Sequence, residues 1–369
     1  MDFYTHGGDI YDCNLDTKTP ILDFSANINP LGLPEQVKQA VTNSLDVCAH
    51  YPDPYCRELT AALSNHYDIC REHIICGNGA ADLITRFTLA QKPKNALLLA
   101  PTFSGYEHAL NLVDCHMTYL NLQAETDFSL TTELFYSEML STLTSNLDVL
   151  FLCNPNNPTG QVIPTNLLKK ILNVCKQHNI TLFLDECFLP FVTDTDTQSL
   201  LPECAAYSNL FLLRAFTKQY AMAGLRLGFG VCSNEILLQQ MFHCGQPWSV
   251  SIPAQHAGIA ALQCNEYWAQ SLTLIDTERA FLIQELQKRN MNVISSKANY
   301  ILFYSPISLE QKLKECNILI RNCENYRGLT KGYYRIAVRT HDENVMLLHA
   351  IAVSYTHLRA HETGRNIVC

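Results

Sequence analysis

The sequence predicts an α/β protein with a large domain built on a mostly parallel sheet and a smaller α/β domain after it. Apolar runs typical of buried strands alternate with helix-like stretches from about residue 70 to 232, the pattern of a sheet covered on both faces. A long helical region, about 253–289, then leads to a second set of alternating segments. With 369 residues, 47% of them hydrophobic, the chain can bury a core large enough for two domains.

We expect four parts along the chain. Residues 1–30 form an amino-terminal arm beside the small domain, 31–255 the large domain and 256–351 the small domain. The apolar spacing of the last expected helix, 343–351, stops at its end. Residues 352–369 are therefore interpreted as a foreign or read-through tail, which we expect to be poorly ordered and without function.

The first candidate binding element is a glycine-rich turn, residues 77–82. It follows an apolar strand, 73–76, and precedes an apolar helix, 83–90. Small residues such as Gly79 and Ala80 let backbone N–H groups approach a phosphate at the positive end of a helix. The turn has the spacing of neither a Walker loop nor a dinucleotide fingerprint, so alone it does not identify a site.

Two further apolar runs, residues 148–153 and 181–184, each end in polar residues. The first continues into Asn154-Pro-Asn-Asn157-Pro-Thr-Gly160, and the second into Asp185. Ligands of open α/β sheets bind in the crevice beyond the carboxyl ends of parallel strands, where these side chains are expected. Asn and Pro also favour plain turns, and Asp is a common helix cap, so each segment alone allows a purely structural role.

The most informative residue is Lys218, which lies between two apolar strands, residues 210–213 and 227–231. A lysine amine is a nucleophile only when neutral, so a Schiff-base lysine needs burial and neighbouring cations that lower its pKa. Thr217 and Arg226 can hold a phosphate, the arginine with two hydrogen bonds. Because most lysines are solvated surface charges, this interpretation depends on the other segments.

In this order, the four segments resemble the fold-type I enzymes that depend on pyridoxal 5'-phosphate, the aspartate aminotransferase superfamily. The resemblance implies the fold of that superfamily and makes Lys218 the Schiff-base lysine. It also places Asp185 on the pyridine nitrogen, where an acid makes the ring an electron sink, and Asn157 on the phenolic oxygen. The remaining implied cofactor contacts are Gly79, Ala80, Thr217 and Arg226 at the phosphate and Phe103 stacked on the ring.

The resemblance also implies a homodimer with active sites at the subunit boundary. Tyr51, in Tyr51-Pro-Asp-Pro, looks like the tyrosine that related enzymes lend to the phosphate of the neighbouring subunit. One residue departs from the family pattern, because relatives usually carry Ser where this chain has Ala215. The missing hydroxyl could weaken cofactor binding by roughly 1.5–3 kcal/mol unless backbone N–H groups or water replace it.

Residues near both ends of the chain are similar to those of the threonine-phosphate decarboxylases of cobalamin biosynthesis. The similarity rests on a His6-Gly7-Gly8 arm, on Asn27, and on Arg321 and Arg335, and it covers nearly everything from residue 4 to about 351. Histidinol-phosphate aminotransferases share the core motifs but are not expected to carry the His-Gly-Gly arm. The implied substrate is a small phosphorylated amino acid. Its implied contacts are His6, Gly7, Asn27, Asn157, Arg321 and Arg335.

The chemistry of these residues agrees with an anionic substrate. His6, the N–H groups of the two glycines and the amide of Asn27 can donate hydrogen bonds, and glycines permit a close backbone approach. Arg321 and Arg335 add two positive charges, each beside an apolar strand that can hold its stem. The alternatives are a disordered amino terminus for His6 and ordinary surface ion pairs for the arginines.

Three functions compete. The first is decarboxylation of L-threonine O-3-phosphate, in which the carboxylate must point out of the cofactor plane and Lys218 could help protonate the carbanion. The products would be carbon dioxide and 1-amino-2-propanol O-phosphate. The second is an aminotransferase acting on histidinol phosphate or a similar amine, which would orient the Cα–H bond instead. The third is a non-catalytic binding protein of the same fold, disfavoured because Lys218 and Asp185 are both present.

Composition excludes several classes of protein. A net charge of −9 and a pI near 5.8 give no basic surface for nucleic acid or anionic lipid. No apolar run reaches 18 residues and no basic-then-apolar leader is seen, so we expect neither a membrane span nor export. The 16 cysteines are scattered without a Cys-x-x-Cys pair, which favours reduced thiols in a cytoplasmic protein. The 13 histidines show no convincing metal-ligand spacing, so we expect no metal.

Overall fold

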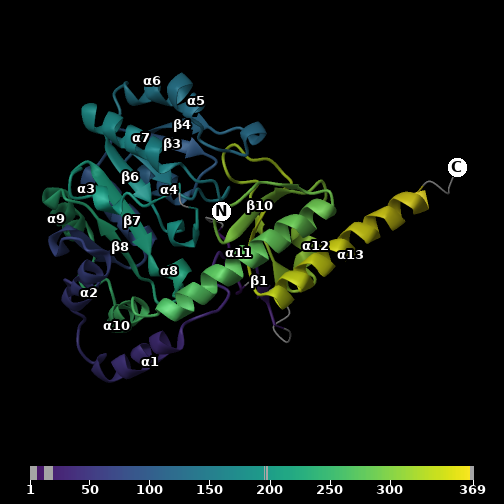
Figure 1. Ribbon diagram of the computed structural model, residues 1–369, viewed down its shortest axis with the longest axis horizontal. Helices are drawn as coiled ribbons and strands as arrows, with labels where there is room; N and C mark the ends of the chain where they lie inside the picture. The colour runs from purple at the N-terminus through teal and green to yellow at the C-terminus, as the bar shows by residue number, and fades with distance from the viewer. Residues whose placement is uncertain (1–5, 12–19, 195, 197, 366–369) are drawn as a thin grey trace.

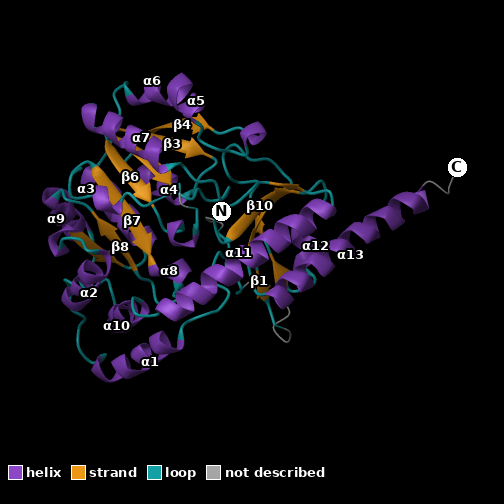
Figure 2. Ribbon diagram, in the orientation of Figure 1, coloured by secondary structure: helices purple, strands orange, loops and turns teal. Residues whose placement is uncertain are grey.

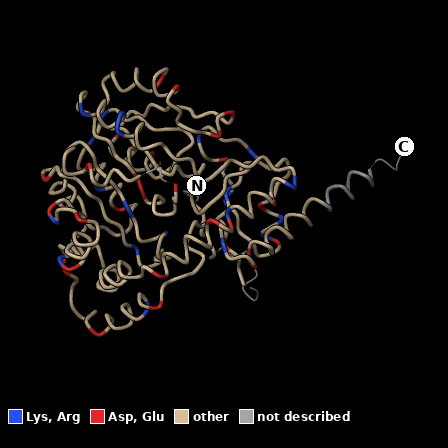
Figure 3. Tube along the Cα trace, in the orientation of Figure 1, with Lys and Arg blue, Asp and Glu red and all other residues tan. Residues whose placement is uncertain are grey.

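The computed structural model describes residues 6–11, 20–194, 196 and 198–365, with 356–365 described as backbone only. Two sheets of different size lie side by side, and a long helix, α11 (Asn265–Lys288), runs between the two parts (Figures 1 and 2). Acidic and basic residues are interspersed along the trace (Figure 3). The expected α/β architecture, with a large and a small sheet, is confirmed.

The large sheet has seven strands in the order β2-β8-β7-β6-β5-β3-β4. Neighbours from β7 through β4 pair in parallel, whereas β8 is antiparallel to both β7 and β2. The strands are β2 (Ile74–Gly77), β3 (Asn95–Ala100), β4 (His116–Asn121), β5 (Val149–Cys153), β6 (Thr181–Asp185), β7 (Leu210–Ala215) and β8 (Gly228–Val231). The carboxyl ends of β5, β6 and β7 therefore meet at one edge.

Helices cover both faces of this sheet because successive strand side chains point to opposite faces. On one face, Leu150 and Leu182 cluster with the apolar stripe of α7, and on the other Phe151 and Phe183 pack with Phe87 of α3. The helices of this part are α1 (Glu35–Ser44), α2 (Arg57–Tyr67), α3 (Ala80–Gln91), α4 (Gly105–Asn111), α5 (Thr132–Leu134), α6 (Leu140–Leu143), α7 (Thr165–Gln177), α8 (Phe216–Gln219), α9 (Glu235–Cys244) and α10 (Ile252–Ala261).

The small sheet is antiparallel, in the order β12-β13-β10-β9, and a separate parallel pair joins β1 to β11. This pairing ties the end of the amino-terminal arm to the small domain, as the sequence predicts. The strands are β1 (Leu22–Asp23), β9 (Asn292–Val293), β10 (Tyr300–Tyr304), β11 (Ile318–Leu319), β12 (Arg321–Asn322) and β13 (Tyr333–Ala337). Besides α11, the helices are α12 (Glu310–Lys314) and α13 (His341–Arg365).

Two helices bear on the expected boundaries, which stay predictions. The division between residues 255 and 256 falls inside α10, which packs against α1 and α2, so we propose that the large domain extends through Ala261. Near the end, α13 continues beyond Ile351 to Arg365. The Tyr355 hydroxyl lies 3.0 Å from Ser305 Oγ, so the first residues of the suspected tail pack on the small domain. Residues 366–369 lie outside the described residues, and the absence of a function for the tail stays a prediction.

Candidate active site

A cavity of about 260 Å³ opens where the carboxyl edge of the large sheet faces the small domain and the arm. Most of the predicted site residues line it. They are His6, Gly7, Asn27, Ala80, Phe103, Asn157, Asp185, Thr217, Lys218, Arg226, Arg321 and Arg335. Gly79 lies directly behind the wall, because a Cβ added there would come within 2.5 Å of Arg226 Nη2. Tyr51 does not line the cavity; it is 78% exposed and stacks on Trp248.

Asp185 is the last residue of β6 and lies on the cavity floor, almost fully buried. Tyr106 Oη donates a hydrogen bond to its Oδ2 at 2.6 Å, and the Cys187 N–H donates to its Oδ1 at 2.9 Å. Burial raises the pKa of Asp185, and these hydrogen bonds oppose that rise by stabilising the carboxylate. Asp185 is thus a fixed acid whose negative charge depends on its two donors.

Lys218 lies in the short helix α8, which follows β7 directly. Burial, together with the positive charges of Arg335 and Arg226, lowers the pKa of its amine to about 8. A Schiff-base lysine requires this, since an amine with a pKa of about 8 is partly neutral near neutral pH. β6 and β7 are adjacent and parallel, so Asp185 and Lys218 extend from neighbouring strand ends into one cavity.

The turn before α3 has the form of an anion-binding element. Gly79 has a φ of +80°, a backbone conformation that favours glycine, and Ala80 begins the helix, where N–H groups are unsatisfied. Arg226 lies beside it and, with Thr217, adds donors to the same part of the cavity. The methyl group of Ala215 lines the cavity on this side. Residue 215 therefore supplies no hydroxyl to the cavity.

The small domain contributes two buried arginines. Arg321 and Arg335 are directly opposite each other on β12 and β13, so both reach the cavity from one face of the sheet. Arg335 donates hydrogen bonds to Asn157 Oδ1 and, at 2.7 Å, to the Ser25 carbonyl. One guanidinium therefore joins the small domain to the Asn-Pro turn of the large domain and to the arm.

The arm places His6 and Gly7 in the cavity wall. The His6 ring centroid lies 5.6 Å from that of Phe103, and a Cβ on Gly7 would come within 2.1 Å of the Ser25 carbonyl oxygen. Burial, followed by the charges of Arg321 and Arg335, lowers the pKa of His6 to about 4. The ring is therefore neutral near pH 7 in the absence of an anion.

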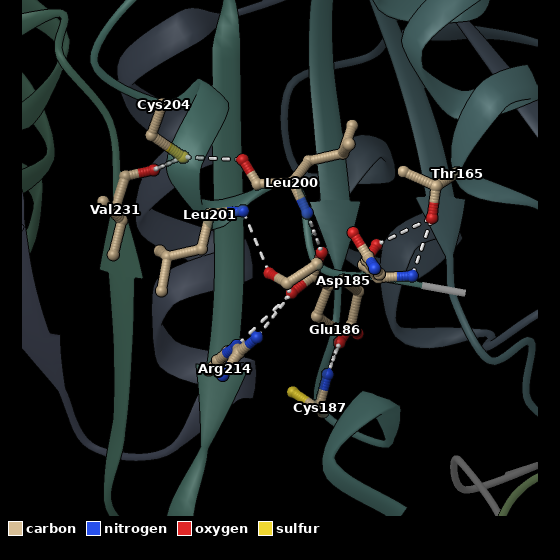
Figure 4. Close-up of polar contacts among 11 residues, drawn as sticks. Thr165, Asp185, Glu186, Cys187, Leu200, Leu201, Cys204, Arg214 and Val231 are labelled. Atoms are coloured by element: carbon tan, nitrogen blue, oxygen red, sulfur yellow. Dashed lines mark hydrogen bonds and ion pairs between the residues drawn. The ribbon is translucent and has the colours of Figure 1, made fainter. Parts of the chain in front are cut away.

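Behind the cavity floor, a buried ion pair joins β6 to β7 (Figure 4). Arg214 Nη2 lies 2.9 Å from Glu186 Oε2, and the Glu186 carboxylate also accepts from the Ser199 hydroxyl and the Leu200 N–H. Glu186 is fully buried and follows Asp185, while Arg214 precedes the Lys218 helix. A buried pair of this kind is weak evidence for stability, but it fixes how two elements sit together.

Sequence reasoning missed several of these residues. Tyr106 is fully buried and does not line the cavity, so nothing in the local sequence indicated its hydrogen bond to Asp185. Glu186 and Arg214 gave no signal, because their pairing depends on which strands are adjacent. Tyr326, which lines the cavity from the small domain, lies in a loop without periodicity.

This fold and cavity define an enzyme of the aminotransferase class I and II type. Residues 19–351 match that family, and the chain belongs to it. A threonine-phosphate decarboxylase of Salmonella typhimurium is 37% identical over 335 residues, covering 90% of each chain.

Two solved structures extend the comparison. A histidinol-phosphate aminotransferase from Clostridium acetobutylicum has a TM-score of 0.83 and 28% identity, covering 91% of this chain and all of the other. An L-threonine-O-3-phosphate decarboxylase from Porphyromonas gingivalis has a TM-score of 0.80 and 22% identity, with 91% and 100% covered. The second likeness supports the fold alone.

Members of this family use pyridoxal 5'-phosphate, the cofactor expected from the sequence. The residues present fit it. The cavity holds the partly neutral amine of Lys218, the buried carboxylate of Asp185 and the ring of Phe103. Beside them, the turn at Gly79 leaves a space that a Cβ would occupy. Ala215 is the one departure.

Among the described residues, no helix is long and apolar enough to cross a membrane. In that same part of the chain, no cluster of three His, Cys, Asp or Glu side chains could hold a metal ion.

Proposed function

We propose that this chain is a pyridoxal-phosphate-dependent decarboxylase that converts L-threonine O-3-phosphate into (R)-1-amino-2-propanol O-2-phosphate and carbon dioxide, a step of cobalamin biosynthesis. The observation that carries this proposal is the placement of Arg321, Arg335 and His6 across the cavity from Lys218 and Asp185. Threonine phosphate carries a phosphate and a carboxylate, and the two arginines match two anionic groups. The 37% identical relative named as a threonine-phosphate decarboxylase supports the same substrate.

We propose that the cofactor is held by Gly79, Ala80, Thr217 and Arg226 at its phosphate, Phe103 on its ring, and Asp185, Asn157 and Lys218 at its polar atoms. When bound, it supplies an electron sink for the bond that breaks at the substrate α-carbon. Lys218 binds the cofactor between turnovers, and its amine then holds the proton that the α-carbon takes up after carbon dioxide leaves. Tyr106 and Cys187 keep the Asp185 carboxylate in place.

Substrate orientation is the task of the opposite wall. His6, Gly7, Asn27, Arg321 and Arg335 bind the phosphate and carboxylate and so decide which α-carbon bond is presented for cleavage. This spends binding energy from a remote, unreactive group on orientation at the reacting centre. His6 gains affinity for a proton when a phosphate dianion enters, because the pKa lowering by its cationic neighbours is then offset.

The working unit in this proposal is a homodimer. Tyr51 lies outside the cavity of its own chain and is 78% exposed, in a stacked pair with Trp248. A tyrosine placed this way is suited to reach the cofactor phosphate of a second copy. The cysteines among the described residues are free thiols, which supports a cytoplasmic location.

The test is to incubate the purified protein with cofactor and L-threonine O-3-phosphate, and to measure carbon dioxide release and 2-oxoglutarate-dependent glutamate formation in parallel. We expect carbon dioxide and no glutamate. Histidinol phosphate, which has no carboxylate, is tested as a second substrate; glutamate formation from it, with no carbon dioxide released from threonine phosphate, would instead favour the aminotransferase. Silence in both assays with the yellow cofactor bound would favour a non-catalytic binding protein.

A further inference from the structure

The loop that joins β12 to β13, residues 323–332, leaves the small domain and lies against the large domain (Figure 1, yellow-green). Its apolar side chains Cys323, Tyr326 and Leu329 are buried in the same cluster as Leu99 and Leu120 of the large sheet. Further along β13, Tyr334 and Ile336 belong to the other cluster. The loop thus belongs to one domain by sequence and to the other by packing.

Two contacts fix the outer side of this loop. The Arg327 guanidinium carbon lies 4.0 Å from the ring centroid of Tyr119 on β4, and its Nη2 lies 3.7 Å from Glu107 Oε1 on α4. Next to it, Gly328 has a φ of +84°, and an added Cβ would lie 3.4 Å from the carbonyl of Ala100. The backbone therefore passes close to the end of β3, and Arg327 contacts β4 and α4 beside it.

The inner side of the same loop holds a cavity arginine. Asn325 Oδ1 accepts a hydrogen bond from Arg321 Nη2 at 2.8 Å, and the Arg321 guanidinium carbon lies 5.3 Å from the Tyr326 ring centroid. Tyr326 is 5% exposed and forms part of the cavity wall. Consecutive residues therefore face opposite ways, Arg327 to the large domain and Tyr326 to the cavity.

The surrounding charges define what this wall recognises. Arg321, Arg335, Arg226, Lys218 and the His6 ring line the cavity, and Asp185 is the only acid among the described lining residues. Tyr326 adds a neutral hydroxyl beside the two small-domain arginines. A phosphate monoester suits this set, because its three oxygens can accept from guanidinium and hydroxyl donors together.

We propose that Arg327 is a positioning residue for substrate recognition. By anchoring the 323–332 loop on Tyr119 and Glu107, it fixes Arg321 and Tyr326 for the phosphate of the substrate, and Tyr326 contacts that phosphate. The identity of the substrate rests on the proposed function, whereas the anchoring of the loop does not. Selection of phosphorylated over unphosphorylated amino acids therefore depends on a contact outside the cavity.

The experiment compares Arg327→Ala and Arg327→Lys with the wild-type holoenzyme. We expect Arg327→Ala to raise KM for L-threonine O-3-phosphate about fivefold, the factor that loss of one exposed cation–π contact gives, with kcat unchanged. Arg327→Lys keeps the charge over Tyr119 and should recover most of the loss. The cofactor dissociation constant, measured by absorbance, should not change, because the cofactor residues lie on the large domain.

A matched control is Lys176→Ala on helix α7. It removes an ammonium group that lies 4.5 Å from the centroid of the Tyr207 ring. It should leave KM unchanged. Tyr326→Phe should weaken phosphate recognition without altering the thermal midpoint. If Arg327→Ala leaves KM unchanged, or lowers kcat and cofactor affinity equally, the inference is wrong.

The probe that separates this inference from the proposed function is inorganic phosphate, followed by calorimetry on the holoprotein. Weaker phosphate binding by Arg327→Ala than by wild type supports the loop anchor even if threonine phosphate is not turned over. Equal phosphate binding by both proteins overturns the anchor even if threonine phosphate is decarboxylated. The two proposals can therefore fail separately.

Discussion

The large-domain wall of the cavity and its small-domain wall are built in different ways. Asp185 and Lys218 extend from adjacent parallel strands that continue through a seven-stranded sheet. Arg321 and Arg335 instead lie on a two-residue strand and its partner, joined by the 323–332 loop. The first wall is the edge of a seven-stranded, mostly parallel sheet, whereas the second lies on a smaller antiparallel sheet and meets the first through contacts such as the Arg335 hydrogen bond to Asn157.

This difference separates two tasks. Groups that serve the chemistry need positions that do not vary with the substrate, and a sheet edge provides them. Groups that select the substrate can lie on a second domain that faces the first across the cavity. We therefore expect changes in the large-domain wall to affect cofactor attachment and turnover, and changes in the small-domain wall to affect substrate affinity.

The largest expected effect follows from Lys218→Ala. Removing the amine should lower decarboxylation by at least ~10³-fold, since both cofactor attachment and proton delivery are lost. Borohydride reduction of the wild-type holoprotein should fix the cofactor to Lys218, as peptide mass spectrometry would show, and the variant should carry no label. Inorganic phosphate binding by the small-domain wall should survive. Lys297→Ala, at a half-exposed lysine paired with Asp194, is the matched control and should remain active.

Arg335→Ala is expected to affect the other wall. It removes the hydrogen bonds to Asn157 and Ser25 and a charge facing the substrate, which should cost about 2–5 kcal/mol in substrate binding. The measurement is KM for threonine phosphate beside the cofactor dissociation constant. Arg335→Lys should recover part of the loss. An unchanged KM with a weakened cofactor would reverse the assignment of Arg335 to the substrate wall.

The lowered pKa of Lys218 leads to a prediction about how the stability of the apoprotein depends on pH. Its folded-state pKa of about 8 lies below the ordinary value of 10.5, so between these pH values the unfolded chain binds more protons. The free energy of unfolding of the apoprotein should therefore rise with pH from about 8 to 10.5, and the full penalty is present below pH 8. Lys218→Met should stabilise the apoprotein at pH 7 by on the order of 2–3 kcal/mol and abolish this slope. Urea unfolding of both proteins at pH 7 and pH 10 measures it; equal slopes would contradict the assignment.

The share of the site that the sequence predicts also differs between the two walls. Asp185, Asn157 and Lys218 could be found because each lies at or shortly beyond the carboxyl end of an apolar strand, and the ends of parallel strands meet at one edge of the sheet. The partners that hold them could not. Tyr106 and Glu186 act across strands whose order in the sheet is set by the fold, and local sequence does not contain that order.

The small-domain wall was less accessible to sequence reasoning. Arg321 and Arg335 were found through resemblance, but the loop residues that place them, Tyr326 and Arg327, show neither periodicity nor a motif. Tyr51 could be named but lies outside the cavity of its own chain, and its role toward a second copy stays a prediction. The tail interpretation of residues 352–369 stays a prediction; α13 continues past Ile351, and Tyr355 packs on Ser305, a contact that apolar spacing does not indicate.

Ala215→Ser is expected to have a smaller effect than the changes at Lys218 and Arg335, and it sharpens the comparison because it improves the large-domain wall alone. Ala215 has extended backbone angles, φ −141° and ψ 143°, so a serine fits without strain, and its hydroxyl would enter the cavity beside Thr217. We expect cofactor affinity to rise about tenfold, the value of one hydrogen bond to a charged group. Titration of the apoprotein with cofactor, followed by absorbance, measures it.

Serine at this position also caps α8, so the thermal midpoint of the apoprotein must be compared as well. A rise in that midpoint without tighter cofactor binding would assign the gain to the cap. A fall in KM for threonine phosphate with unchanged cofactor affinity would show that the two walls are not separate.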